Sequence, residues 1–164
     1  MSAADVLELE RQAERAYTGL GMSRQFTLDE LLAHMEEQRE AAIIVKPVEG
    51  MTHGELTGLW FSMPGIELIL HANTGSALHR EQIILHELAH MALGHEKLMD
   101  DPGHLAALLP DLAPARIAKV LARCEHGEEH EIVAEALADL FAQAIARSRR
   151  GQRAEPLNFG DVFG

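Results

Sequence analysis

This chain of 164 residues has almost no cysteine and no long apolar run. Its single cysteine, Cys124, excludes an internal disulfide framework and is typical of a reducing compartment. With no second cysteine near it, Cys124 is interpreted as a bystander rather than a nucleophile or a ligand. No apolar run approaches the ~20 residues of a membrane-spanning helix. The first residues are acidic and lack a basic and then apolar signal segment, so we expect a cytoplasmic protein.

Positive charge is scarce as well. The 14 Lys and Arg residues are outnumbered by 26 Asp and Glu residues, which gives a net charge of −12. Nucleic acids and anionic membranes bind cationic surfaces, so this charge argues against either as a direct partner. The only basic cluster lies near the C-terminus and is interpreted as favourable charge at the end of a helix; it consists of Arg147, Arg149, Arg150 and Arg153.

The spacing of apolar residues predicts an α+β fold that is mostly helical with a small three-stranded sheet. One domain is expected over residues 1–150, followed by a C-terminal tail (151–164), with turn composition beginning at Arg149. The expected helices are 5–17, 28–39, 78–95, 104–109, 114–123 and 128–147, and the expected strands are 42–47, 56–62 and 67–71. Thr27 and Glu30 have the spacing of a capping box, and Trp60 is expected to pack between the sheet and a helix.

Residues 83–93 are predicted to form a helix that is apolar almost all round, which is typical of a buried helix. Only His86, Glu87 and His90 interrupt it. Because four residues make little more than one turn, the two imidazoles project from one face and can hold one metal ion, with Glu87 beside it. This is the HExxH pattern of zinc hydrolases. A chance match would more often fall on a solvated face, and burying these groups without a cation would be costly.

A catalytic zinc site also needs a third protein ligand and an open position. The metzincin extension is missing, because Leu93 and Glu96 occupy the positions of its glycine and third histidine. His95 is predicted to lie well away from the face of His86 and His90, at the helix end or on the surface.

The last long helix carries acids at every fourth position of an apolar segment: Glu131, Glu135 and Asp139. This row is either the solvent face of an amphipathic helix or the source of the third ligand. Carboxylates at i and i+4 repel each other unless something positive lies between them, which favours a ligand and an acid that orients a metal-bound imidazole.

The motifs His86-Glu87-Leu88-Ala89-His90, Leu93-Gly94-His95 and Glu131-x-x-Ala134-Glu135-x-x-Ala138 resemble the ImmA/IrrE family of gluzincin-type metallopeptidases. The resemblance includes Gly58-Leu59-Trp60 and covers roughly residues 28–141. It implies a zincin-like domain with zinc bound by His86, His90 and Glu131, with Glu87 as general base and Glu135 behind His86 or His90. Two departures leave Glu135, backed by Asp139, as the alternative ligand. Gln143-Ala144-Ile145 stands where many members have Leu-Met-Pro, and the spacing from His90 to Glu131 is long.

The same resemblance implies a regulatory zinc metallo-endopeptidase that cleaves or inactivates a partner protein, such as a helix-turn-helix repressor. The alternative is a non-catalytic toxin or regulatory binding module whose structural zinc is closed by a fourth protein ligand. Glu87 argues against that alternative, because a structural site has no use for a general base. His126 and His130 are candidates for oxyanion stabilisation by position only, and the oligomeric state is not predicted.

Overall fold

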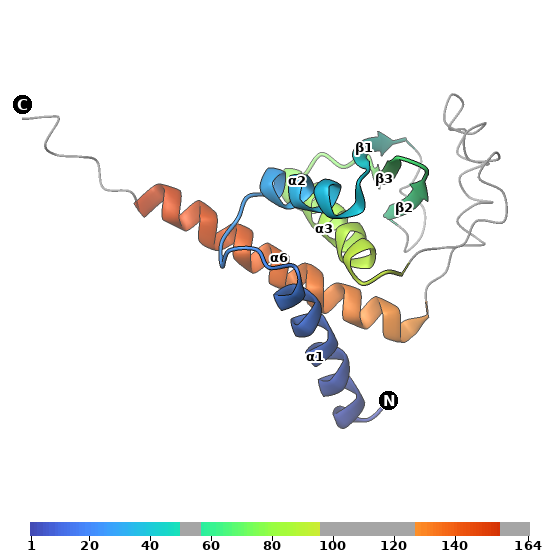
Figure 1. The fold of residues 1–164 in the computed structure, drawn as a ribbon, viewed down its shortest axis with the longest axis vertical. Coiled ribbons are helices and arrows are strands. Elements are labelled where there is room, and N and C mark those ends of the chain that lie inside the picture. The colour runs from blue at the N-terminus through green and yellow to red at the C-terminus, as the bar shows by residue number, and fades with distance from the viewer. Residues whose placement is uncertain (50–56, 96–126, 155–164) are drawn as a thin grey trace, which may run out of the picture.

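The computed structural model describes residues 1–49, 57–95 and 127–154 (Figure 1). The helices are α1 (Ala3–Gly19), α2 (Leu28–Arg39), α3 (Ala77–Ala92) and α6 (Glu128–Ala154), and the strands are β1 (Ala42–Val48), β2 (Gly58–Met63) and β3 (Ile66–Ala72). The prediction of a mostly helical α+β chain with a small three-stranded sheet is confirmed for these residues. The helices expected at 104–109 and 114–123 lie outside them.

Side-chain caps set where the helices begin. Ser2 and Thr27 form capping boxes with Asp5 and Glu30, so the box predicted from the sequence is present at α2. The Ser76 side chain accepts a hydrogen bond from the His79 amide at the start of α3. These local signals explain why the beginnings of α2 and α3 agree closely with the expectation.

The end of α6 differs from the prediction. The helix continues to Ala154, so the expectation of turn structure from Arg149 is wrong for residues 149–154. Contacts with distant parts of the chain hold the C-terminal part of α6: the Arg149 guanidinium pairs with Glu81 of α3, and Arg147 donates to the Arg24 carbonyl at 3.0 Å. Two of the four clustered arginines therefore anchor α6 instead of only balancing its helix dipole.

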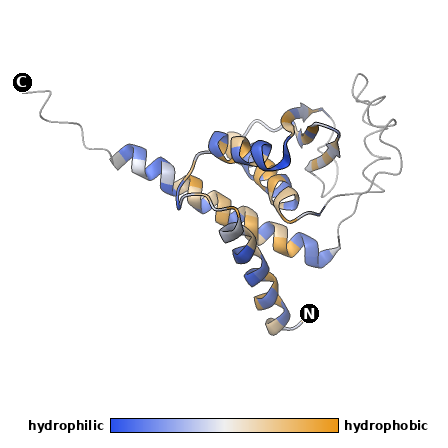
Figure 2. Ribbon diagram, in the orientation of Figure 1, coloured by the Kyte–Doolittle hydropathy of each residue, from blue (hydrophilic) through white to orange (hydrophobic). Residues whose placement is uncertain are grey.

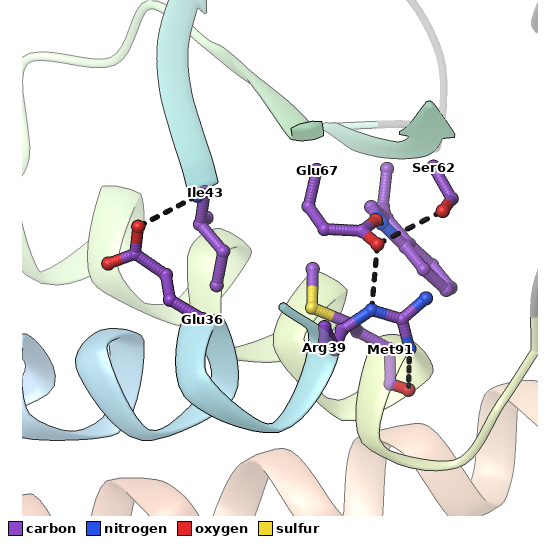
Figure 3. Close-up of polar contacts among 7 residues, drawn as sticks. Glu36, Arg39, Ile43, Ser62, Glu67 and Met91 are labelled. Atoms are coloured by element: carbon purple, nitrogen blue, oxygen red, sulfur yellow. Dashed lines mark hydrogen bonds and ion pairs between the residues drawn. The ribbon is translucent and has the colours of Figure 1, made fainter. Parts of the chain in front are cut away.

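The sheet is mixed, with strand order β1-β3-β2. β3 runs parallel to β1 and antiparallel to β2. Pro64 and Gly65 make the short turn between β2 and β3, and Gly65 has a φ of 74°, in the left-handed region that favours glycine. At the β1 edge, the Ile43 amide donates to the Glu36 carboxylate of α2 at 3.1 Å, which ties that helix to the sheet (Figure 3).

Helix α3 lies between the sheet and α6, and α1 crosses α6 and extends away from the sheet (Figure 1). Figure 2 shows hydrophobic residues along the strands, α3 and the middle of α6, while the ends of α6 are more hydrophilic. Leu88 and Ala89 of α3 and Leu137 and Phe141 of α6 are fully buried in this core. Within the described ranges, no helix combines the length and apolarity needed to cross a membrane.

A buried carboxylate links α2, the sheet and the end of α3 (Figure 3). Glu67 of β3 is 3% exposed and accepts hydrogen bonds from Trp60 Nε1 at 2.7 Å, Arg39 Nε at 2.8 Å and Ser62 Oγ at 3.0 Å. The Arg39 guanidinium lies 5.2 Å from the centre of the Trp60 ring and donates to the Met91 carbonyl at 3.5 Å. Trp60 thus packs between the sheet and a helix, as expected.

Candidate metal centre

Two helices bring three metal-ligating side chains together. His86 and His90 of α3 and Glu131 of α6 offer ligand atoms that all lie within 4.8 Å of one another. The two Nε2 atoms are 3.1 Å apart, and the Glu131 carboxylate spans them, with Oε2 3.1 Å from His86 Nε2 and Oε1 3.4 Å from His90 Nε2. This group can hold a metal ion.

The donor set indicates which ions suit the site. Calcium and magnesium prefer sites made almost wholly of oxygen ligands, whereas imidazole nitrogen suits zinc and other first-row transition metals. Two imidazoles and one carboxylate also make the three-ligand set of several catalytic zinc sites. The chemistry of these residues therefore fits a borderline transition-metal ion such as zinc.

The three side chains differ in their exposure to solvent. The side chain of His90 is 1% exposed, that of His86 is 25% exposed and that of Glu131 is 46% exposed. The group is therefore anchored in the core by His90, and Glu131 is its most exposed member.

The electrostatics of the cluster favour a cation. Hydrogen bonds from the imidazoles of His86 and His90 hold the pKa of the Glu131 carboxyl well below its usual range. Burial, the largest single influence, lowers the pKa of His86, but the hydrogen bond to Glu131 and the charges of Glu87, Glu131 and Glu135 together raise it. The carboxylates thus attract positive charge to this point.

Glu135 occupies a different position from Glu131. Its Oε2 lies 3.3 Å from Nδ1 of His86, the nitrogen that faces away from the cluster, and its side chain is 70% exposed. Asp139, one turn further along α6, is exposed. Glu131 is thus the acid placed beside both Nε2 atoms, and Glu135 the acid placed behind one imidazole, which is the arrangement that the family resemblance implies.

Glu87 is buried beneath the sheet and is 6% exposed. A Cβ atom added at Gly58 of β2 would stand 2.8 Å from Glu87 Oε1 and 2.5 Å from Ile83 Cγ2. Real Cβ atoms essentially never make contacts this short. Gly58 is therefore required for the close approach of β2 to α3 at the position of the Glu87 carboxylate.

This contact predicts that Gly58→Ala moves either the Glu87 carboxylate or helix α3. We expect the overpacked variant to lose about 1–3 kcal/mol of unfolding free energy, measured by denaturant titration. Gly19→Ala is the matched control, since a Cβ there meets nothing within 4 Å. Equal stability of the two variants would show that β2 does not approach α3 so closely in solution.

His95 lies just after the end of α3, as expected, but the prediction that it lies well away from the face of His86 and His90 is wrong. Its Nδ1 lies 3.0 Å from Nδ1 of His90, and the residue is partly buried. The cause is the way α3 ends: Gly94 adopts a φ of 70°, its amide donates to the Met91 carbonyl at 3.2 Å, and the His95 amide donates to the His90 carbonyl at 3.0 Å. This is a Schellman motif, which folds the chain back onto the last helical turn.

His130 extends the row of imidazoles. Its ring stacks on that of His95, with centroids 3.9 Å apart and planes 10° apart. This stacking places the ring of His130 beside that of His95, and its role as an oxyanion stabiliser stays a prediction. Burial first, and then the neighbouring His130 and His90, lower the pKa of His95 to about 4, so its imidazole is neutral at neutral pH. His126 and Cys124 lie outside the described residues.

Comparisons with protein families, curated proteins and solved structures find no match to this chain. The ImmA/IrrE resemblance and the zincin-like assignment therefore stay predictions from the motifs. The geometry of His86, His90 and Glu131 stands independently of that resemblance.

Proposed function

We propose that this chain is a zinc-dependent metallo-endopeptidase. The observation that carries the proposal is the three-donor cluster of His86, His90 and Glu131, two of whose side chains are partly exposed. The buried carboxylate of Glu87 is close enough for its charge to raise the pKa of His86. A purely structural metal would need neither the carboxylate of Glu87 at the second position of HExxH nor a coordination position left open by the protein. The motif resemblance to the ImmA/IrrE family supports the same function.

In this proposal one group of residues binds the metal and another residue transfers a proton. When bound, zinc supplies a Lewis acid that polarises a peptide carbonyl and activates water. His86, His90 and Glu131 would bind it, and Glu135 orients the His86 ring through Nδ1. Glu87 accepts the proton of the attacking water at its carboxylate and passes it to the leaving amine as the peptide bond breaks.

The substrate we propose is a partner protein, for which a helix-turn-helix repressor is the example that the family resemblance implies. The net charge of −12 suits a basic, DNA-binding partner, because complementary charge speeds encounter and disfavours acidic competitors. In this proposal the protease regulates its partner by cleaving or inactivating it, and it works in the cytoplasm without binding DNA or a membrane itself.

Replacing the general base separates catalysis from metal binding. Glu87→Gln should bind zinc as the wild type does and lose peptide hydrolysis by about 100-fold or more, since the amide cannot accept the proton of water. Zinc content by elemental analysis and new peptide termini by mass spectrometry, after incubation with a proteome-derived peptide library, measure the two properties.

The control is wild-type protein stripped with a chelator and then given back zinc, which should lose and regain activity. Retained cleavage by the zinc-loaded Gln variant would show that another base is used. Wild type that binds one zinc ion but cleaves nothing would favour the non-catalytic binding module, and a fourth protein ligand detected by X-ray absorption spectroscopy would establish a structural site.

A further inference from the structure

We propose that His95 is a positioning residue for the metal centre: it accepts a hydrogen bond from Nδ1 of His90 and so directs Nε2 of His90 at the metal. This inference rests on the proposed zinc site and goes beyond it by naming what orients its buried ligand. The two Nδ1 atoms are 3.0 Å apart, and the ring of His95 is held on its other face by the stacked ring of His130.

The backbone conformation at the end of α3 brings His95 next to His90. In the Schellman motif at the end of α3, His90 is the third residue from the helix end and His95 is the second residue after the cap, and their backbones are joined by a 3.0 Å hydrogen bond. This motif commonly brings the side chains of these two positions into contact, usually as an apolar pair. Here the pair consists of two imidazoles.

Metal binding at Nε2 of His90 fixes the tautomers of both the His90 and the His95 ring. A neutral imidazole has one N–H and one acceptor nitrogen, and a ring that offers the lone pair of Nε2 to a metal carries its proton on Nδ1. When Nε2 of His90 binds metal instead of donating to Glu131, His90 donates from Nδ1, and His95 accepts at Nδ1 and keeps its own proton on Nε2. An acceptor at this position locks the tautomer that binds metal.

A neutral imidazole suits the position behind His90, because the site already carries several negative charges. His86 is already backed by the carboxylate of Glu135 at 3.3 Å, and Glu87 and Glu131 bring to three the carboxylates whose charges act on His86. Three carboxylates around one divalent cation leave a surplus of one negative charge. A neutral acceptor behind His90 orients that ring without adding a fourth carboxylate.

The test compares three replacements of His95 by competitive chelator titration with zinc. His95→Phe keeps a ring that can stack on His130 but removes the acceptor, so we expect zinc affinity to fall about 10- to 100-fold, as for other partners of metal-bound imidazoles. His95→Asn keeps an acceptor oxygen near the position of Nδ1 and should regain most of that loss. His95→Ala removes both contacts and should bind zinc no better than the Phe variant.

Two further measurements separate orientation of the ligand from general structural damage. The Co²⁺-loaded Phe variant should show a changed visible spectrum, because the geometry around the ion depends on the angle of His90, while the Asn variant should resemble wild type. Thermal unfolding of the metal-free proteins should differ little. His79→Ala, an exposed histidine near the start of α3, is the control and should leave affinity and spectrum unchanged.

Zinc binding by wild type with undiminished affinity in His95→Phe would overturn this inference and leave the proposed function standing. A loss in His95→Asn equal to that in His95→Phe would also overturn it, because the hydrogen bond would then not be the cause. Failure of wild type itself to bind zinc would refute the metal site and the role of His95 together.

Discussion

Glu131→Ala should weaken zinc binding far more than Glu135→Ala, although the two acids stand one helical turn apart on α6. The Glu131 oxygens lie 3.1 Å from Nε2 of His86 and 3.4 Å from Nε2 of His90. The Glu135 carboxylate instead faces Nδ1 of His86 at 3.3 Å. One variant loses a ligand, and the other loses only a group that orients a ligand.

The expected sizes follow from these positions. Loss of a partner behind a metal-bound imidazole typically lowers metal affinity roughly 10- to 100-fold, which is the expectation for Glu135→Ala. Glu131→Ala leaves only two protein ligands, and we expect its affinity to fall about tenfold or more below that of Glu135→Ala. Zinc binding is coupled to folding, so the stabilisation of the fold by added zinc should shrink in the same order.

Competitive chelator titration of both variants measures the difference, and Asp139→Ala serves as the control, since Asp139 is an exposed acid of the same helix. The control should bind zinc like the wild type. A result in which Glu135→Ala loses the metal while Glu131→Ala keeps it would place the ligand one turn later, with Glu135 as ligand and Asp139 behind it.

The parts of this structure that the sequence predicted well depend on short stretches of chain. The capping box of Thr27 and Glu30 involves residues three apart, and the shared face of His86 and His90 follows from helical spacing alone. The apolar runs between glycine and proline turns predict the three strands. In each case the physical cause lies within a few residues of the element, so no knowledge of the tertiary fold was needed.

The structure places His95 differently from the prediction, although the sequence contains the signal for its position. Leu93-Gly94-His95 at a helix end has the form of a Schellman motif, in which glycine takes a positive φ and the next residue folds back onto the last turn. Helical periodicity predicts a helix through residue 95, and on such a helix His95 would lie away from His90. The glycine ends the helix and reverses that conclusion.

Other features depend on contacts that no local pattern contains. The extension of α6 to Ala154 is held by Arg149 against Glu81, which is distant in sequence. Pairing of Glu131 with the HExxH helix likewise requires α3 and α6 to pack side by side. The acidic row of α6 was compatible with a solvent face until that packing placed Glu131 at the imidazoles.

The last expected result concerns Glu67, which was predicted only as the first residue of a strand. Glu67→Gln should lower the free energy of unfolding by about 3 kcal/mol or more, because removing the charge of one partner leaves a largely buried cation poorly compensated. The Arg39 side chain is 19% exposed and that of Glu67 is 4% exposed, so water can replace the lost partner only in part. Trp60 and Ser62 also donate to this carboxylate.

Denaturant titration of metal-free protein measures this loss without any contribution from zinc. Glu37→Gln is the control, because Glu37 is an exposed acid of α2, and a surface change of this kind usually stays within about 0.5 kcal/mol. The double variant Arg39→Met with Glu67→Gln should be more stable than the sum of the single losses predicts, by about 0.5–3 kcal/mol for groups in direct contact. Strict additivity, or a loss in Glu67→Gln no larger than in the control, would show that this ion pair does not hold α2 and the end of α3 against the sheet.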